Sequence, residues 1–121
     1  VGFTVAGKAL TASVLPEVVC TLGSIPTAPY ATPSTDEIPA SIEELVLHYD
    51  AIMLDHHGAL TLGEDIWSAF YKMETLEHYA QTLLVAELLG GAKALSGEQV
   101  NALLQIRSTY GLHRPIRLDG N

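Results

Sequence analysis

The stretch DAIMLDHHGALTLG, from Asp50 to Gly63, decides how the rest of the sequence is interpreted. It holds two short apolar runs, residues 51–54 and 59–62, separated by Asp-His-His-Gly. Both runs have the length of strands and are too short for helices. Gly58, which has no Cβ, suits a tight turn or a bulge between them. The sequence therefore predicts two adjacent strands joined at a bend that carries two histidines.

His56 and His57 lie at the end of the first predicted strand, next to the bend, so the sequence predicts a buried imidazole there. Neighbouring side chains of an extended chain point to opposite sides, so only one of the two histidines is expected to face a given cleft. Such an imidazole is either a metal ligand or acid/base group, or a core histidine that a backbone carbonyl satisfies; the second arrangement is the more common. A metal site here needs further ligands from elsewhere in the fold.

The composition describes one acidic domain, or part of one. Of the 121 residues, 48% are hydrophobic and only 17% are charged, which argues against disorder. The net charge of −8 argues against binding to nucleic acid. Cys20 is the single cysteine, so a reducing compartment fits. No membrane-spanning run and no signal-peptide pattern is visible, and the expected location is cytoplasmic.

The segments before the strands are irregular. Residues 1–6 are apolar and precede Gly7, which predicts either the last turn of a helix or a frayed first strand. The helix alternative implies that the chain is cut from a longer one. Residues 18–22 predict a strand or a helical turn, and the prolines of residues 25–35 predict an extended connection.

Three helices are predicted after that connection. Ser41 and Glu44 form a capping-box pattern for a helix that ends near His48, and Ser96 opens a second such pattern for a helix that ends near Thr109. Between them, residues 64–89 form the longest predicted helix, which Gly90 and Gly91 end. Its apolar stripe is Ile66, Phe70, Met73, Leu76, Ala80, Leu83 and Leu84. Two further features of this helix are Trp67 and Tyr71, candidates for packing against another subunit, and His78 with Glu74, an expected surface pair.

Two segments, taken together and with their spacing along the chain, resemble the class II aldolase/adducin family. They are SIPTAPYATP at residues 24–33 and LDHHG at residues 54–58, followed by the long helix with ETLE at residues 74–77. The nearest members are the fuculose phosphate aldolases and the ribulose phosphate epimerases. The resemblance implies an α/β fold, a three-layer α/β/α sandwich with a largely antiparallel central sheet. Residues 1–121 would be the C-terminal part of such a domain.

The resemblance also implies a site. Enzymes of the family bind a divalent metal, usually zinc, through three histidines, and the match places one of these ligands at His57 and a structural role at His56. The other two ligands and a catalytic Glu belong to a His-x-His-Pro motif and its upstream segment, which this sequence lacks and which would precede Val1. The implied protein is a homotetrameric lyase that cleaves a sugar phosphate through a metal-stabilised enediolate.

One departure from the family pattern leaves the reaction open. Fuculose-type aldolases place a catalytic Tyr in the loop before the Ile-Pro segment, whereas residues 14–17 here read Val-Leu-Pro-Glu. Decarboxylase and dehydratase branches of the family therefore remain alternatives, as does a non-catalytic, adducin-like interaction module. The retained His57 favours an enzyme. The chain alone is expected to be inactive, because catalytic zinc normally has three protein ligands.

Overall fold

The computed structural model describes residues 1–112 and 115–118. His113 and Arg114, part of the predicted irregular tail, lie outside the described residues. In chain order the elements are α1 (Gly2–Val5), α2 (Pro16–Thr21), β1 (Thr27–Ala28), α3 (Glu37–Ile42), η1 (Leu45–Leu47, a 3-10 helix), β2 (Ala51–Leu54), β3 (Gly58–Thr61), α4 (Ile66–Leu88), α5 (Gly97–Ile106) and η2 (Arg107–Tyr110, also 3-10). None of the helices in this part of the chain is long and apolar enough to cross a membrane.

The three strands form a mixed sheet in the order β1-β2-β3. β1 runs parallel to β2, with Thr27 opposite Met53, and β2 runs antiparallel to β3, with Ile52 opposite Leu60. The two strands predicted around the His-His-Gly segment are confirmed, the second beginning one residue earlier than predicted. One parallel and one antiparallel pairing fit an α/β fold, while the largely antiparallel sheet in three layers stays a prediction.

The bend between β2 and β3 differs from the prediction. Gly58 is the first residue of β3, and the residue that takes the left-handed backbone conformation is His56, with φ 56°. His56 and His57 lie in the turn and are exposed, so the predictions of a buried imidazole and of an extended segment with opposite-facing side chains are wrong. The chain reverses within three residues after β2, and strand alternation does not extend into a turn of that length.

Helix α4 is the long predicted helix. Asp65 caps its first turn by accepting a hydrogen bond from the Ser68 N–H, and Gly90 and Gly91 follow its end with positive φ. Only two residues of the predicted stripe, Leu76 and Leu83, are buried, and Tyr79, which the stripe did not include, is almost fully buried. Three stripe members are exposed: Ile66, Phe70 and Leu84.

The predictions for the shorter helices are only partly confirmed. α1, with Gly7 at φ 64° beyond its end, and the capping box of Ser96 and Gln99 in α5 are confirmed. Residues 18–22 lie mostly in a helix, α2, which Pro16 begins. The capping box predicted at Ser41 is wrong: Ser41 lies near the end of α3 and its hydroxyl donates to the Ile38 carbonyl.

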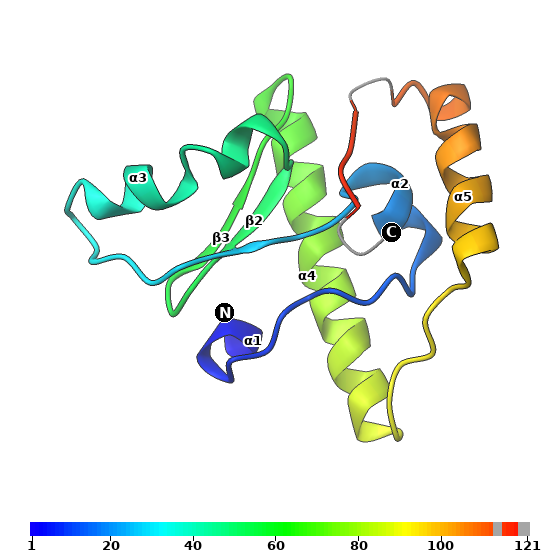
Figure 1. Ribbon diagram of the computed structural model, residues 1–121, viewed down its shortest axis with the longest axis horizontal. Coiled ribbons are helices and arrows are strands. Elements are labelled where there is room, and N and C mark those ends of the chain that lie inside the picture. Colours follow the sequence, from blue (N-terminus) through cyan, green and yellow to red (C-terminus); the bar gives the residue numbers. More distant parts are fainter. Residues whose placement is uncertain (113–114, 119–121) are drawn as a thin grey trace.

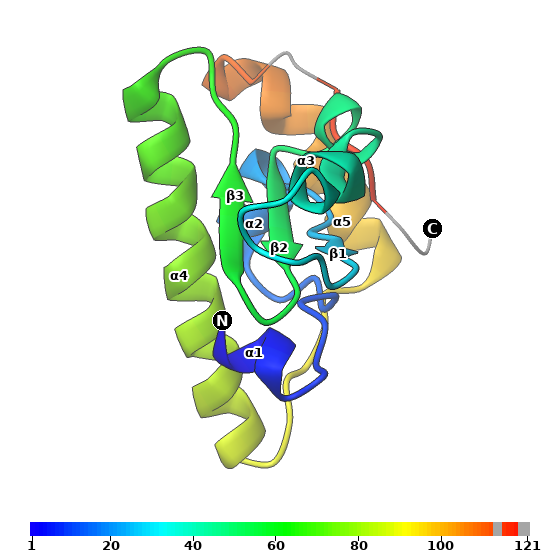
Figure 2. The same cartoon turned by 90° about the vertical axis from the view of Figure 1, so that its left-hand side faces the viewer.

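The core lies on both sides of β2. Ala51 and Met53 belong to the larger cluster, with α4 and α2, whereas Ile52 packs in a smaller cluster with residues of α3 and η1. Figure 2 shows α4 along the β3 side of the sheet, α2 behind the strands and α3 on the viewer's side, and Figure 1 shows α3 and α2 on opposite sides of the strands. Alternate side chains of one strand therefore face helical segments on opposite sides.

Two local features fix α4 against the sheet. Lys72 on α4 donates from Nζ to the Asp50 carboxylate at 2.7 Å and to the Leu62 carbonyl at 2.9 Å, where both side chains are largely buried. Gly63 lies so close to the start of α4 that a Cβ there would be 2.4 Å from the Ala69 backbone nitrogen. The connection between β3 and α4 therefore passes so close to the helix backbone that position 63 requires a glycine.

Candidate functional site

The candidate site lies where β1 and β2 end. Because these strands are parallel, their carboxyl ends meet at the same edge of the sheet, and the Asp55 N–H donates to the Ala28 carbonyl at 3.3 Å. Tyr30 follows β1 after two residues, and residues 55–57 follow β2 directly. This topology brings Tyr30, Asp55, His56 and His57 to one edge, which is where ligands bind in many sheets with parallel strands.

The turn that carries both histidines is braced by side chains. Asp55 Oδ1 lies 2.9 Å from His56 Nδ1, and the Tyr30 ring meets the His56 ring edge-on, with centroids 6.3 Å apart. The backbone closes the turn through a hydrogen bond of 3.0 Å from the His57 N–H to the Leu54 carbonyl. These contacts surround His56, whose backbone takes the left-handed conformation directly before His57.

His57 itself is exposed, and none of the described residues forms a hydrogen bond or an ion pair with its side chain. The ring nitrogens of such an imidazole are available to a ligand from outside this part of the chain. Within residues 1–112 and 115–118, no three His, Cys, Asp or Glu side chains gather closely enough to hold a metal ion. The described part of the chain therefore offers His57 as an accessible imidazole, but no complete set of metal ligands.

The N-terminus lies near this turn. In both views the N-terminus and α1 lie beside the tip of the β2–β3 turn (Figures 1 and 2).

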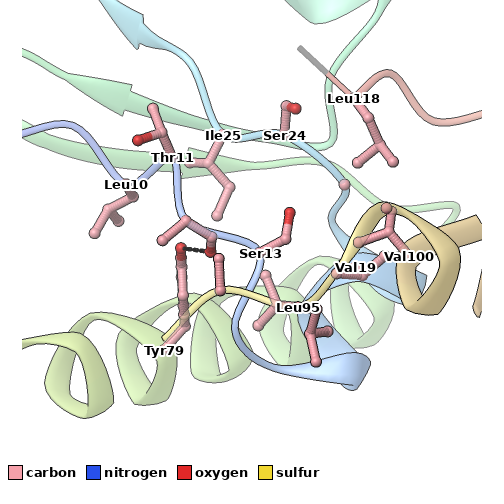
Figure 3. A pocket seen from close by; sticks show the side chains of 15 residues that line it. Leu10, Thr11, Ser13, Val19, Ser24, Ile25, Tyr79, Leu95, Val100 and Leu118 are labelled. Atoms are coloured by element: carbon pink, nitrogen blue, oxygen red, sulfur yellow. Dashed lines mark hydrogen bonds between the residues drawn. The ribbon is translucent and has the colours of Figure 1, made fainter. Parts of the chain in front are cut away.

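A cavity of about 250 Å³ forms a second concave region, in the helical half of the molecule (Figure 3). Its wall combines apolar side chains, with Leu10 and Leu118 on opposite sides, with polar groups that include Ser13 and Ser24. Tyr79 also lines it, and its hydroxyl donates to the Ala12 carbonyl. Burial raises the pKa of Tyr79 to about 12. No residue of the β2–β3 turn lines this cavity, so it is separate from the candidate site.

Comparison with known sequences places most of the chain in one family. The profile described as the Class II Aldolase and Adducin N-terminal domain matches residues 1–84. The 3-oxo-tetronate 4-phosphate decarboxylase of Escherichia coli K12 is 33% identical over 70 residues, 58% of this chain and 33% of the relative. The L-fuculose phosphate aldolase of the same strain is 31% identical over 90 residues, 74% of this chain and 42% of the relative. The chain thus spans less than half the length of these relatives.

Solved structures agree with the sequence matches. YgbL from Klebsiella pneumoniae, whose structure is described as that of an aldolase/epimerase/decarboxylase candidate, superposes with a TM-score of 0.69 at 28% identity, over 77% of this chain and 44% of its own. An L-fuculose 1-phosphate aldolase superposes with a TM-score of 0.75 at 23% identity, over 86% of this chain and 49% of its own. The second match shows a shared fold.

Proposed function

Because the chain belongs to the class II aldolase and adducin family, we propose that residues 1–121 are the C-terminal part of a carbon–carbon lyase domain in which His57 is one ligand of a divalent metal. The observation that carries the proposal is the exposed imidazole of His57 on a braced turn at the carboxyl ends of β1 and β2. Family membership alone would not separate an enzyme from a scaffold, whereas a held and accessible metal-binding side chain favours an enzyme.

The roles of the chain's own residues follow from the turn. His57 offers a ring nitrogen that is a good donor to zinc and to other transition metals when the imidazole is neutral. The hydrogen bond between Asp55 and His56, and the Tyr30 ring against His56, keep the turn in one conformation. The site is pre-organised by these contacts, which lowers the entropy that binding would otherwise lose.

The metal we propose is zinc, because imidazole ligands suit it and catalytic zinc sites usually have three protein ligands with one open position. Enzymes of this family are typically metal-dependent. A bound divalent metal supplies a Lewis acid beside a substrate carbonyl. His57 fills one ligand position, and we propose that the remaining ligands belong to polypeptide that enters beside the β2–β3 turn. The 121 residues alone are therefore expected to be inactive.

The proposed reaction is cleavage of a carbon–carbon bond next to a carbonyl in a phosphorylated sugar. The names of the sequence relatives support this class, since one is an L-fuculose phosphate aldolase and the other a 3-oxo-tetronate 4-phosphate decarboxylase. Aldol cleavage is the first candidate. Decarboxylation is the second candidate. Fuculose-type aldolases place a catalytic tyrosine in the loop that corresponds to residues 14–17, and this segment has no tyrosine. Pro16 in this segment begins helix α2.

Two properties of the whole protein belong to the same proposal. Cys20 is a buried free thiol, which fits a reducing, cytoplasmic compartment. We propose a homo-oligomer, a tetramer as the family resemblance implies, to which the exposed aromatic side chains Trp67 and Tyr71 and the segment near Tyr30 offer apolar surface.

The test joins this chain to the part of the Escherichia coli L-fuculose phosphate aldolase that lies outside the match, and measures bound metal by mass spectrometry. His57→Ala should remove at least nine tenths of the metal. His56→Asn should retain most of it, because Asn readily takes the left-handed conformation of position 56. Circular dichroism of each variant controls for folding. Equal metal loss in the two variants, or full retention in His57→Ala, would contradict the assignment.

A further inference from the structure

The cavity of about 250 Å³ in the helical half of the molecule has no part in the proposed reaction (Figure 3). Segments far apart in the sequence surround it: the loop before α2, α2 itself, the segment that leads to β1, α4, and the start of α5. Two hydrogen bonds tie the loop before α2 to its neighbours. The Leu95 N–H donates to the Ser13 carbonyl at 2.7 Å, and the Tyr79 hydroxyl donates to the Ala12 carbonyl. The walls are therefore fixed by contacts made around the space, as in a preformed pocket.

The C-terminal side of the cavity depends on a glycine. Gly23 has a φ of 67°, and a Cβ at this position would lie 2.9 Å from the Arg117 carbonyl oxygen. Because that atom is absent, residues 116–118 lie directly against residues 23–24, and the Ser24 N–H donates to the Arg117 carbonyl at 2.9 Å. This close contact brings Leu118 into the wall of the cavity, opposite Leu10.

The lining of the cavity is uncharged, since none of the described residues that form it has an ionised side chain at neutral pH. Hydroxyl groups come from Thr11, Ser13 and Ser24. Figure 3 shows the Ser13 hydroxyl directed into the space between the labelled side chains, and it forms no hydrogen bond with the described part of the chain. The aliphatic part of the wall is Leu10, Val18, Val19, Ile25, Leu95, Val100 and Leu118. A buried charge without a partner is far more costly than a buried hydroxyl, so this lining disfavours ions of either sign.

Water alone fits this lining poorly. At about 30 Å³ per molecule the cavity would hold roughly eight waters, and each buried water needs about two to four polar partners. Waters against the aliphatic side chains of Val19 and Ile25 would lack those partners. A molecule with an apolar body and one polar group would cover the aliphatic wall and reach a hydroxyl at the same time. Its binding would release the poorly bonded waters, which favours affinity.

We propose that this cavity binds a small neutral organic molecule that has an aliphatic body and one hydroxyl or carbonyl group. The Ser13 hydroxyl hydrogen-bonds the polar group, while Val19 of α2 and Val100 of α5 cover the body. A cavity of about 150 Å³ accommodates benzene, so one of about 250 Å³ has room for roughly ten non-hydrogen atoms. The site goes beyond the proposed function, because it includes neither His57 nor any other residue of the β2–β3 turn.

The experiment titrates the 121-residue chain with cyclohexanol, which lies within that size limit, and follows the protein's methyl groups by NMR. Cyclohexanol should show nuclear Overhauser contacts with the methyl groups of Val19, Ile25 and Val100, and should shift their signals until the site is saturated. Cyclohexylammonium and cyclohexanecarboxylate carry the same ring with a positive or a negative charge, and both should bind at least tenfold more weakly. Equal binding of the three probes, or no contact of cyclohexanol with these methyl groups, would overturn the proposal.

Two substitutions of Ser13 separate the hydroxyl from the space. Ser13→Ala removes the polar partner and should weaken cyclohexanol binding about fivefold. Ser13→Leu places a larger side chain in the cavity and should abolish the saturable shifts. Ser108→Ala and Ser108→Leu, at an exposed position of η2 that does not line the cavity, are the matched controls and should bind normally.

Circular dichroism of each variant controls for folding. Unchanged binding in either Ser13 variant, or equal loss in the Ser13 and Ser108 variants, would contradict the assignment. The readout needs no metal, so its outcome is independent of the test on His57.

Discussion

At the scale of single residues, the conformation of His56 makes a direct prediction. A φ of 56° is costly for residues with a Cβ, most of all for β-branched ones, and asparagine tolerates it well. His56→Asn should therefore change the free energy of unfolding by less than about 0.5 kcal/mol, the range of neutral surface substitutions. His56→Val should lower it by about 1–2 kcal/mol. Urea denaturation measures both, and equal effects would show that the turn does not require this conformation.

Tyr79 makes a prediction about alkaline pH. Its hydroxyl donates to Ala12 in the core, and burial raises its pKa to about 12. An unfolded tyrosine has a pKa near 10. Between these values the folded state holds a proton that the unfolded state has lost, so stability is full below pH about 10 and falls as pH rises to about 12. The loss should reach about 2–3 kcal/mol.

The control for that pH dependence is Tyr79→Phe, which cannot ionise at this position. Its free energy of unfolding should be lower at neutral pH by about 1–3 kcal/mol, because the Ala12 carbonyl loses its partner. The difference between the two proteins should then shrink between pH 10 and 12, measured by urea denaturation in both. A constant difference would mean that Tyr79 ionises as readily in the fold as outside it.

At the scale of elements, α4 offers neighbouring positions with opposite environments. Leu83 is 4% exposed in the larger core cluster, and Leu84 is 54% exposed. Leu83→Ala should lower the free energy of unfolding by about 2–5 kcal/mol, the usual range for a buried leucine. Leu84→Ala should stay within about 0.5 kcal/mol. Chemical denaturation of the pair tests which face of the helix meets the sheet, and similar losses at both positions would reject the assignment.

The ion pair between α4 and the sheet gives a second prediction at this scale. Lys72→Met removes a cation that lies 2.7 Å from the buried Asp50 carboxylate, and removal of one partner of a buried pair typically costs about 3–5 kcal/mol. Lys93→Met, at an exposed position, is the matched control and should cost little. The double variant Asp50→Asn with Lys72→Met should lose less than the sum of the single ones. Strict additivity would show that the two side chains do not interact.

These elements also show what a sequence pattern can and cannot predict. The strands and α4 were predictable because apolar run length and helical spacing are local properties. The exposure of Ile66 and Phe70 was not predictable, because helical periodicity identifies an apolar face but not which of its residues other elements cover. The Ser41 pattern failed for a similar reason: a capping box is a possible helix start, and the chain began its helix earlier, at Glu37.

The candidate site was predictable only in part. The resemblance located His57 by the residues around it, and its role as a ligand stays a prediction. The bracing of the turn could not be read from sequence, because Tyr30 reaches His56 through the parallel pairing of β1 with β2. A non-glycine residue with positive φ is likewise an outcome of tertiary contacts.

At the scale of the whole molecule, apolar surface predicts association of the isolated chain. Val85, Leu88 and Leu89 at the end of α4 are between 55% and 83% exposed. A patch of this kind is rarely left open in a monomer. Sedimentation at micromolar concentration should therefore show species heavier than 13.0 kDa. A monomer of that mass with cooperative unfolding would contradict the part-domain proposal.

The matched variants for association add charge at two places. Leu88→Glu combined with Leu89→Glu should shift the distribution toward the monomer, because the patch would then carry repelling charges. Gln105→Glu, exposed on α5, adds charge away from the patch and should leave the distribution unchanged. If both variants change it equally, net charge rather than this surface controls association.

The close path at Gly63 limits how the gene can vary. Every single-base change that replaces a glycine codon with that of another amino acid introduces a Cβ, and at this position that atom would overlap backbone that cannot rotate away. Neither alanine nor serine, the mildest replacements, avoids the overlap. Substitutions are therefore expected to be absent at this codon even where both flanking positions vary. Any relative in which the chain takes this path between sheet and helix should have glycine at the position equivalent to 63.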